Sequence, residues 1–264
     1  METKLDSKGK RFFAPAIAAG LMLAMAFTFN ACGGDGGGGD DTPDSSSSSN
    51  GSLSSSSSGG GSLSSSSQPS LKCGEYKHEE KFCDERDEKL YKYVKINGQI
   101  WMAENLNRNV AGSRCYDDDE DNCEIYGRLY DWDAAINACP SGWHLSNNEE
   151  WDKLYRYADG TSDTDSPYES ETAGKYLKSK EGWNWEGISG NGEDTYGFSA
   201  LPGGYGNSGG DFYFNSVGIR SYWWSASEYD SDYAYIRGMY YDIEDASWNY
   251  RGKSYLYSVR CVKD

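Results

Sequence analysis

The aromatic residues of this chain are confined to its later part. Residues 1–70 contain neither tyrosine nor tryptophan, so all 22 tyrosines and all 9 tryptophans lie from Tyr76 onward. A Ser/Gly-rich segment without large aromatic residues cannot bury enough apolar surface to offset the entropy cost of folding. The sequence therefore predicts one globular domain over residues 71–264, which at about 190 residues has the size of an ordinary domain.

The formal net charge of −17 limits the partners of such a domain. Nucleic-acid phosphates are bound by clustered Lys and Arg side chains, and an acidic surface repels them. We therefore expect no nucleic-acid partner.

The first 31 residues have the parts of a secretory signal peptide. An apolar run covers residues 12–29, and the small residue Ala31 precedes Cys32. The basic residues before the run are Lys4, Lys8, Lys10 and Arg11. A transmembrane anchor is the alternative, but about 18 residues is marginal for a span, and a polar Gly-rich segment follows at once. The pattern favours a signal peptide over residues 1–31.

The segment Phe29-Asn30-Ala31-Cys32 resembles the lipobox of bacterial lipoproteins, although that pattern prefers Leu at the first position and a smaller second residue. The resemblance implies that the Cys32 thiol carries a diacylglycerol and anchors the mature chain in a membrane. Cys32 is also the odd member of seven cysteines. By the sorting pattern of such proteins, Gly33 implies the outer membrane, with the domain displayed at the cell surface.

Residues 33–70 are almost entirely Gly, Ser and Asp, and the segment 51–54 recurs as 61–64. We expect residues 32–70 to be a lipidated cysteine followed by a disordered Ser/Gly tether. A flexible coil of this composition spans roughly 35 Å root-mean-square, enough to lift a domain off a lipid surface.

Six cysteines remain after Cys32, an even number in a chain predicted to enter an oxidising compartment. Fifteen pairings are possible. Proximity along the chain favours Cys73 with Cys83 and Cys115 with Cys123, which leaves Cys139 with Cys261. Zinc binding is the alternative, and it is disfavoured because the chain has no Cys-x-x-Cys motif and only two histidines.

Two local patterns predict secondary structure. Tyr91–Ile96 and Gln99–Met102 are rich in β-forming residues, and Asn97-Gly98 between them is a strong hairpin signal. Ser146 and Glu149 have the spacing of a capping box. The helix that would follow has one apolar face, made of Trp151, Leu154, Tyr155 and Ala158.

A second short helix is expected over residues 172–179, and the remaining sequence is rich in Gly, Tyr and Trp. The sequence therefore predicts an α+β fold with a mixed antiparallel sheet, one or two short helices and disulfide cross-links.

Several sequence blocks resemble the Fibrobacter succinogenes major paralogous domain. They fall in order at Val94–Leu106, Tyr126–Tyr130, Cys139–Leu145, Gly197–Gly204, Trp223–Ser225 and Ser258–Val262. The resemblance covers the whole expected domain. It implies an exported protein and no assigned activity.

Residues 132–151 are similar to the first-helix region of C-type lectin-like domains, and formylglycine-generating enzymes share a similar stretch. In such lectin-like domains, a cysteine of this region pairs with one in the last strand, which implies the pair Cys139–Cys261 and a C-type lectin-like sheet. The sugar-reading motifs of calcium-dependent lectins are missing, since Trp248-Asn249 precedes Tyr250 and not Asp. The expected pairing leaves no cysteine for formylglycine chemistry, so we expect no enzymatic activity and no cofactor.

The acidic run between Cys115 and Cys123 offers Asp117, Asp119 and Asp121 as oxygen ligands for calcium. It lacks the Gly and Glu positions of an EF-hand loop, so a solvated acidic loop is the favoured interpretation. His144 is expected to be a packed, hydrogen-bonded residue and not a catalytic base.

Five tryptophans lie in stretches expected to form loops or short strands, and their flat rings are candidates to stack on sugars. They are Trp183, Trp185, Trp223, Trp224 and Trp248. The alternative is that aromatic residues build the core in place of Leu and Ile, as we expect for Trp101, Trp143 and Trp151. Trp223 and Trp224 are neighbours, so in a strand they point to opposite faces, which allows one of them to face outward.

The function expected from these observations is that of a surface-displayed outer-membrane lipoprotein. Its domain would be a non-catalytic binding or adhesion module for a plant-type polysaccharide or a cell-surface protein. One alternative is a structural lipoprotein of the cell envelope without a small ligand. Another is a cryptic carbohydrate hydrolase.

Overall fold

The computed structural model describes residue 73, residues 80–207 and residues 212–264. The expected signal peptide (1–31) and the lipidated Cys32 with its tether (32–70) lie outside the described residues, so they stay predictions. Within the part that is described, no helix is long and apolar enough to cross a membrane.

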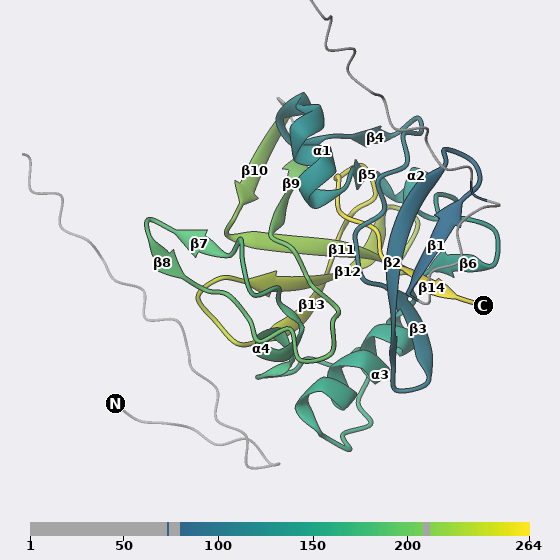
Figure 1. Ribbon diagram of the computed structural model, residues 1–264. Helices are drawn as coiled ribbons and strands as arrows, with labels where there is room; N and C mark the ends of the chain where they lie inside the picture. Colours follow the sequence, from purple (N-terminus) through teal and green to yellow (C-terminus); the bar gives the residue numbers. More distant parts are fainter. Residues whose placement is uncertain (1–72, 74–79, 208–211) are drawn as a thin grey trace, which may run out of the picture. The chain divides into compact units, whose positions relative to one another are not determined.

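The first of two five-stranded sheets is antiparallel throughout (Figure 1). Its strands, in spatial order, are β1 (Lys81–Asp84), β2 (Lys89–Ile96), β3 (Gln99–Met102), β14 (Cys261–Lys263) and β6 (Trp143–Leu145). The predicted hairpin is confirmed, because Asn97 and Gly98 join β2 to β3 with φ angles of 48° and 81°. The last strand of the domain, β14, therefore lies between β3 of the hairpin and the edge strand β6.

The second sheet carries the longest strands. In spatial order they are β10 (Tyr213–Val217), β9 (Gly203–Asn207), β11 (Arg220–Glu228), β12 (Tyr233–Tyr240) and β13 (Ala246–Gly252). All neighbours are antiparallel except β9 and β11. Two short ribbons, β4 (Ser113–Arg114) with β5 (Leu129–Tyr130) and β7 (Asn184–Trp185) with β8 (Ile188–Ser189), complete the strands.

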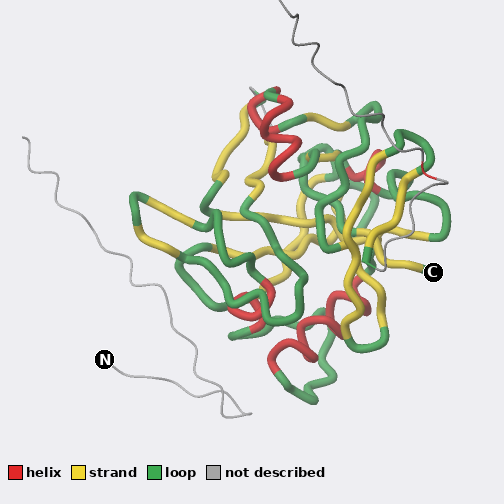
Figure 2. The backbone as a smooth tube through the Cα atoms, viewed as in Figure 1, coloured by secondary structure: helices red, strands yellow, loops and turns green. Residues whose placement is uncertain are grey.

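The helices are short, and most of the described chain is strand or loop (Figure 2). They are α1 (Glu120–Tyr126), α2 (Trp132–Ala135), α3 (Asn148–Asp159) and α4 (Ala173–Leu177), with a 3₁₀ turn at Tyr116–Asp118. The described residues thus form four α-helices where the sequence predicted one or two. The predicted apolar face of α3 is confirmed, since its four members are buried.

The capping box of α3 was predicted one residue too early. Asn147 is the N-cap, and its side chain accepts from the Glu150 amide while the Glu150 carboxylate accepts from the Asn147 amide. Ser146 is not available as a cap because its hydroxyl donates to the Arg260 carbonyl.

Three disulfides confirm the expected pairing. The Cα–Cα distances are 5.3 Å for Cys73–Cys83, 5.1 Å for Cys115–Cys123 and 5.9 Å for Cys139–Cys261. The third bond ties the segment before β6 to β14 across 122 residues of sequence. The domain is therefore a disulfide-linked α+β fold with mostly antiparallel sheets.

A buried polar pair joins segments that are far apart in sequence. The Asn105 amide donates to the Tyr126 carbonyl, and its oxygen accepts from the Trp223 indole and from Arg260. Arg260 also donates to the carbonyls of Met102, Phe198 and Ser199. These residues belong to, or adjoin, five of the blocks that carry the family resemblance, so those blocks meet in the core.

Candidate binding surface

Three of the five candidate tryptophans are unavailable to a ligand. Trp183, Trp223 and Trp224 are each 0 % exposed. Trp223 and Trp224 do point to opposite faces of β11, but both faces are covered, since Trp223 packs in the cluster around Trp151 and Trp224 packs against Tyr257. The expectation that one of them faces outward is wrong, because a strand pattern does not tell whether its second face is covered.

Hydrogen bonds also hold these buried indoles in place. The Trp224 indole donates to the Tyr130 carbonyl and the Trp183 indole to the Ala200 carbonyl. Together with the bond from Trp223 to Asn105, they fit the core role that the sequence predicted for Trp101, Trp143 and Trp151. Of these three, Trp101 and Trp151 are fully buried and Trp143 is half-buried.

Trp185 and Trp248 reach the surface. Trp185 is 44 % exposed on the β7–β8 hairpin, next to the exposed Ile188. Trp248 lies half-buried on β13. The two tryptophans lie in different sheets, so strand pairing does not place their rings side by side.

Trp248 belongs to a row of contacting aromatic rings, which we call the aromatic strip. Its members are Tyr229, Tyr233, Tyr235, Trp248 and Tyr250. Ring centroids are 4.0 Å apart for Tyr229 and Tyr250, which are parallel within 5°, and 5.7 Å apart for Tyr229 and Tyr235. They are 5.9 Å apart for Tyr233 and Tyr250 and 5.8 Å apart for Tyr235 and Trp248.

Strand register explains why these rings meet. Tyr235 is directly opposite Tyr250, and Trp248 is opposite Arg237 in the β12–β13 pair. Because side chains alternate between faces, Tyr233, Tyr235 and Arg237 share one face of β12. The signal was present in the sequence as Tyr-x-Tyr and Trp-x-Tyr at period two, yet the sequence analysis singled out tryptophans and missed the four tyrosines.

The face of β12 and β13 that carries the aromatic strip is exposed to solvent at one end and covered at the other. Arg237 is fully buried, where its guanidinium lies 2.8 Å from the Asp152 carboxylate and donates to the carbonyls of Tyr168 and Asn148. Tyr229, Tyr233 and Tyr250, at the other end, are 49 %, 43 % and 37 % exposed. The strip is therefore the uncovered half of a face whose other half packs against α3 and the loop after it.

A pocket of about 590 Å³ adjoins the strip at Tyr233. Its walls come from the start of α2, the β11–β12 turn and the end of β13, and consist of Asp131, Asp133, Ser231, Asp232, Tyr233, Gly252, Lys253 and Ser254. The Lys253 ammonium is already paired with Glu228 at 3.3 Å and lies 4.5 Å from the centre of the Trp132 ring. The wall of this pocket therefore carries the carboxylates of Asp131, Asp133 and Asp232, while its lysine is already paired.

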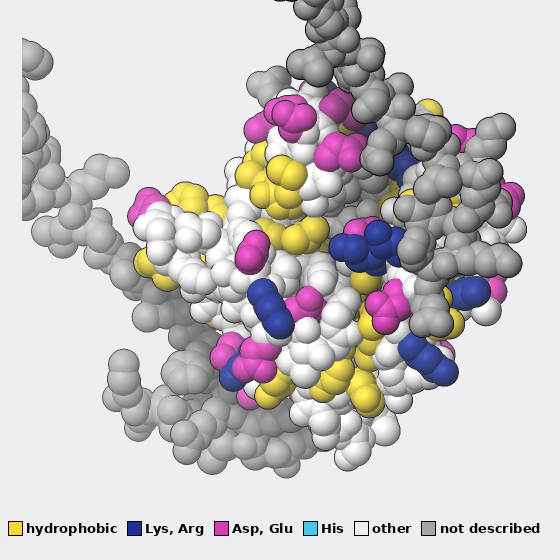
Figure 3. Space-filling model, viewed as in Figure 1, with side chains coloured by type: hydrophobic (Ala, Val, Ile, Leu, Met, Phe, Trp, Pro, Cys, Tyr) yellow, Lys and Arg dark blue, Asp and Glu magenta, His cyan; other side chains and the backbone are white. Residues whose placement is uncertain are grey.

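Two further pockets, of about 350 and 850 Å³, adjoin each other at Glu104 and Leu201. Figure 3 shows the face that carries α1 and β2, where acidic and basic side chains are interspersed with hydrophobic ones. The smaller pocket has two carboxylates in its wall, Glu104 and Glu124. Glu104 is held by the amide and ammonium groups of Lys92.

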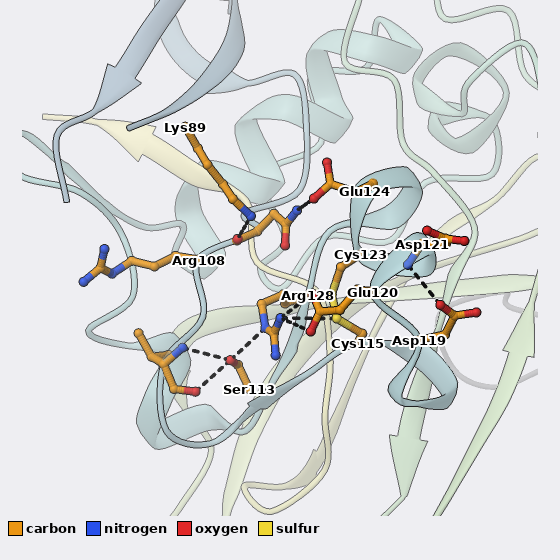
Figure 4. A network of polar contacts seen from close by, with 12 residues as sticks. Lys89, Arg108, Ser113, Cys115, Asp119, Glu120, Asp121, Cys123, Glu124 and Arg128 are labelled. Atoms are coloured by element: carbon orange, nitrogen blue, oxygen red, sulfur yellow. Dashed lines mark hydrogen bonds and ion pairs between the residues drawn. A yellow bond between two sulfur atoms is a disulfide. The ribbon is translucent and has the colours of Figure 1, made fainter. Parts of the chain in front are cut away.

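The acidic loop does not gather the three proposed calcium ligands. Asp117, Asp119 and Asp121 are exposed, and the Asp119 carboxylate accepts from the Asp121 amide as the N-cap of α1 (Figure 4). Within the described residues, the group close enough to share an ion is Cys115, Glu120 and Cys123. Its cysteines form a disulfide, and Arg128 contacts Glu120, so the loop gives calcium binding no support.

His144 has both ring nitrogens occupied. Its Nδ1 lies 2.6 Å from the Asp264 carboxylate and its Nε2 lies 2.8 Å from Glu150. Partial burial lowers the pKa of His144, but these two hydrogen bonds outweigh burial and raise it above 6.5. The residue thus connects β6, α3 and the chain end, as expected of a packed histidine.

The structure defines a disulfide-linked α+β domain with a buried polar centre and an exposed aromatic face. The chain belongs to the Fibrobacter succinogenes major domain family, whose profile matches residues 94–263, more than half of the chain. No curated protein and no solved structure matches it. The family resemblance is thereby confirmed, whereas likeness to C-type lectin domains stays a prediction.

Proposed function

We propose that this protein is a surface-displayed outer-membrane lipoprotein whose domain binds polysaccharide without catalysing a reaction. The observation that carries the proposal is the aromatic strip. Exposed apolar surface that is continuous marks interaction sites more often than scattered apolar residues do. Tyrosine and tryptophan combine a flat apolar ring with a polar group, a combination suited to a ligand with apolar faces and hydroxyl edges.

The strip is also rigid. Four of its five rings stand on β12 and β13, which pair over seven residues, and each ring contacts another. Little side-chain freedom is left to lose on binding, so the rings are pre-organised for a ligand. A tether of the kind expected over residues 32–70 would let this face reach an insoluble fibre from a membrane.

Pull-down of the full-length protein in detergent on insoluble cellulose and xylan tests the proposal. Trp248→Ala with Tyr250→Ala should reduce retention at least about tenfold, in line with the loss of two aromatic anchors. Trp185→Ala is the control, since it removes an exposed tryptophan ring outside the strip. No depletion of the wild type at micromolar concentration would contradict the proposal and favour a structural envelope lipoprotein.

The hydrolase alternative rests on two carboxylates, Glu104 and Glu124, in the wall of the pocket of about 350 Å³. Glycosidases use such a pair as acid and base or nucleophile. Release of soluble sugar from the same polymers, abolished by Glu124→Gln, would establish that function in place of simple binding.

A further inference from the structure

We propose that the aromatic strip selects neutral glycan chains and rejects chains built from uronic acids. The inference rests on the proposed function and names the class of polysaccharide. It follows from the charges that surround the strip.

Carboxylates flank the strip where its rings are most exposed. Asp230 follows Tyr229 and Asp232 precedes Tyr233 in sequence, and both acids are exposed, whereas Glu228 is paired with Lys253. The Asp230 carboxylate accepts from the amides of Asp232 and Tyr233, which fixes the turn that carries these acids.

The adjoining pocket extends this negative border. Asp131 and Asp133, at the start of α2, line the pocket together with Asp232 and Tyr233. The Asp131 carboxylate accepts from the Ala134 amide, so its position is set by the helix N-terminus. A chain lying on the strip and leaving it past Tyr233 therefore passes between carboxylates of two elements.

The nearby cations are engaged. Lys253 is paired with Glu228 and donates to the Ser231 carbonyl. Arg251 donates to the neutral oxygens of the Asn249 side chain and the Tyr250 carbonyl and so keeps its charge, but strand alternation places it on the opposite face from Tyr250. Arg237 shares the face of the strip but is buried and paired with Asp152. Among the described residues that form the strip and its pocket, none offers a free positive charge to a uronate.

A sugar hydroxyl and a sugar carboxylate interact differently with the protein carboxylates around the strip. A sugar hydroxyl donates to carboxylate oxygens, whereas a uronate brings a second negative charge with no cation to meet it. The repulsion acts between exposed groups, so it weakens as salt rises, with a screening length of about 10 Å at 0.1 M.

The test uses polymer pairs that differ in charge and share a backbone. Retention of the full-length protein in detergent is measured on regenerated cellulose against C6-oxidised cellulose, and on neutral arabinoxylan against glucuronoxylan. At low salt we expect binding to each neutral polymer to be at least about tenfold tighter, with a ratio that falls as salt is added. Asp133→Asn with Asp232→Asn should reduce the ratio towards one.

The control is Asp117→Asn with Asp121→Asn, which removes the same charge from an exposed loop outside the strip and its pocket. If the neutral and acidic polymers bind the wild type equally, the selectivity is disproved while polysaccharide binding stands. If both double variants lower the ratio equally, the overall charge of the domain causes the selectivity, and the role proposed for the border of the strip is disproved. If no polymer is retained, the proposed function fails, and this inference fails with it.

Discussion

Arg260 shows how much of this domain depends on one buried side chain. Its guanidinium is fully buried and donates to three backbone carbonyls and to the Asn105 oxygen at 2.6–2.9 Å. No carboxylate contacts it among the described residues. Removing the donor leaves several buried oxygens without a partner, which costs more than one surface hydrogen bond.

We therefore expect Arg260→Met to lower the free energy of unfolding by about 3 kcal/mol or more, because each buried oxygen left without a donor costs about 1–3 kcal/mol. Urea denaturation followed by tryptophan fluorescence measures this. Arg251→Met, at a half-exposed site, should cost under about 1 kcal/mol. Equal effects of the two substitutions would show that the buried network contributes little.

His144 gives the domain a stability that depends on pH. Because its folded pKa is raised above 6.5, the imidazolium held between Asp264 and Glu150 stabilises the fold fully below about pH 6. This contribution is lost as pH rises through the raised pKa. Unfolding of the wild type should therefore become easier as the pH rises above about 6.5 through the raised pKa of His144, and His144→Gln should flatten that slope. A slope unchanged by the substitution would assign the pH dependence to other groups.

At the scale of elements, the parts that were predicted are those in which a local pattern determines the structure. The Asn97-Gly98 turn requires positive φ at two residues, and the α3 face repeats at helical spacing, so both were visible in sequence. The burial of Trp223 and Trp224 was not visible in the sequence, because it depends on the packing of distant elements against both faces of β11. The cap of α3 moved to Asn147 for a similar reason, since Arg260 engages Ser146.

The strip illustrates the same limit. Tyr233 and Tyr235 alternate with buried residues as any half-covered strand does, and the position of α3 decides which half of the face stays open. Sequence alone therefore identified the exposed Trp185 and the half-buried Trp248 together with three buried tryptophans, without a means of separating them.

The Cys139–Cys261 disulfide ties the segment before the edge strand β6 to the neighbouring strand β14 of the first sheet. It closes the longest loop among the three bonds, with a sequence separation of 122 against 10 for Cys73–Cys83. By the loop-entropy model, replacing both Cys139 and Cys261 by Ser should cost about 2–5 kcal/mol. The same change at Cys73 and Cys83 should cost less. Thermal unfolding of the two double variants measures the difference, and a reversed order would contradict the model for this domain.

At the scale of the whole molecule, we expect membrane anchoring and polysaccharide binding to be independent of each other. The strip lies on β12, β13 and the turn before β12, far from Cys32 in sequence. Loss of the lipid should therefore leave polysaccharide retention unchanged while it removes the protein from membranes.

Cys32→Ala tests this separation. Two or three acyl chains give nearly permanent anchoring, at about 0.8 kcal/mol per buried methylene, so their loss should move the protein from the membrane fraction to the soluble fraction. Metabolic labelling with a palmitate analogue should mark the wild type and not the variant. Circular dichroism and the pull-down on cellulose are the controls, because the other six cysteines are paired in disulfides that Cys32 does not join. Labelling of the variant would place the lipid on another residue. A soluble variant that no longer binds would show that anchoring and binding are coupled.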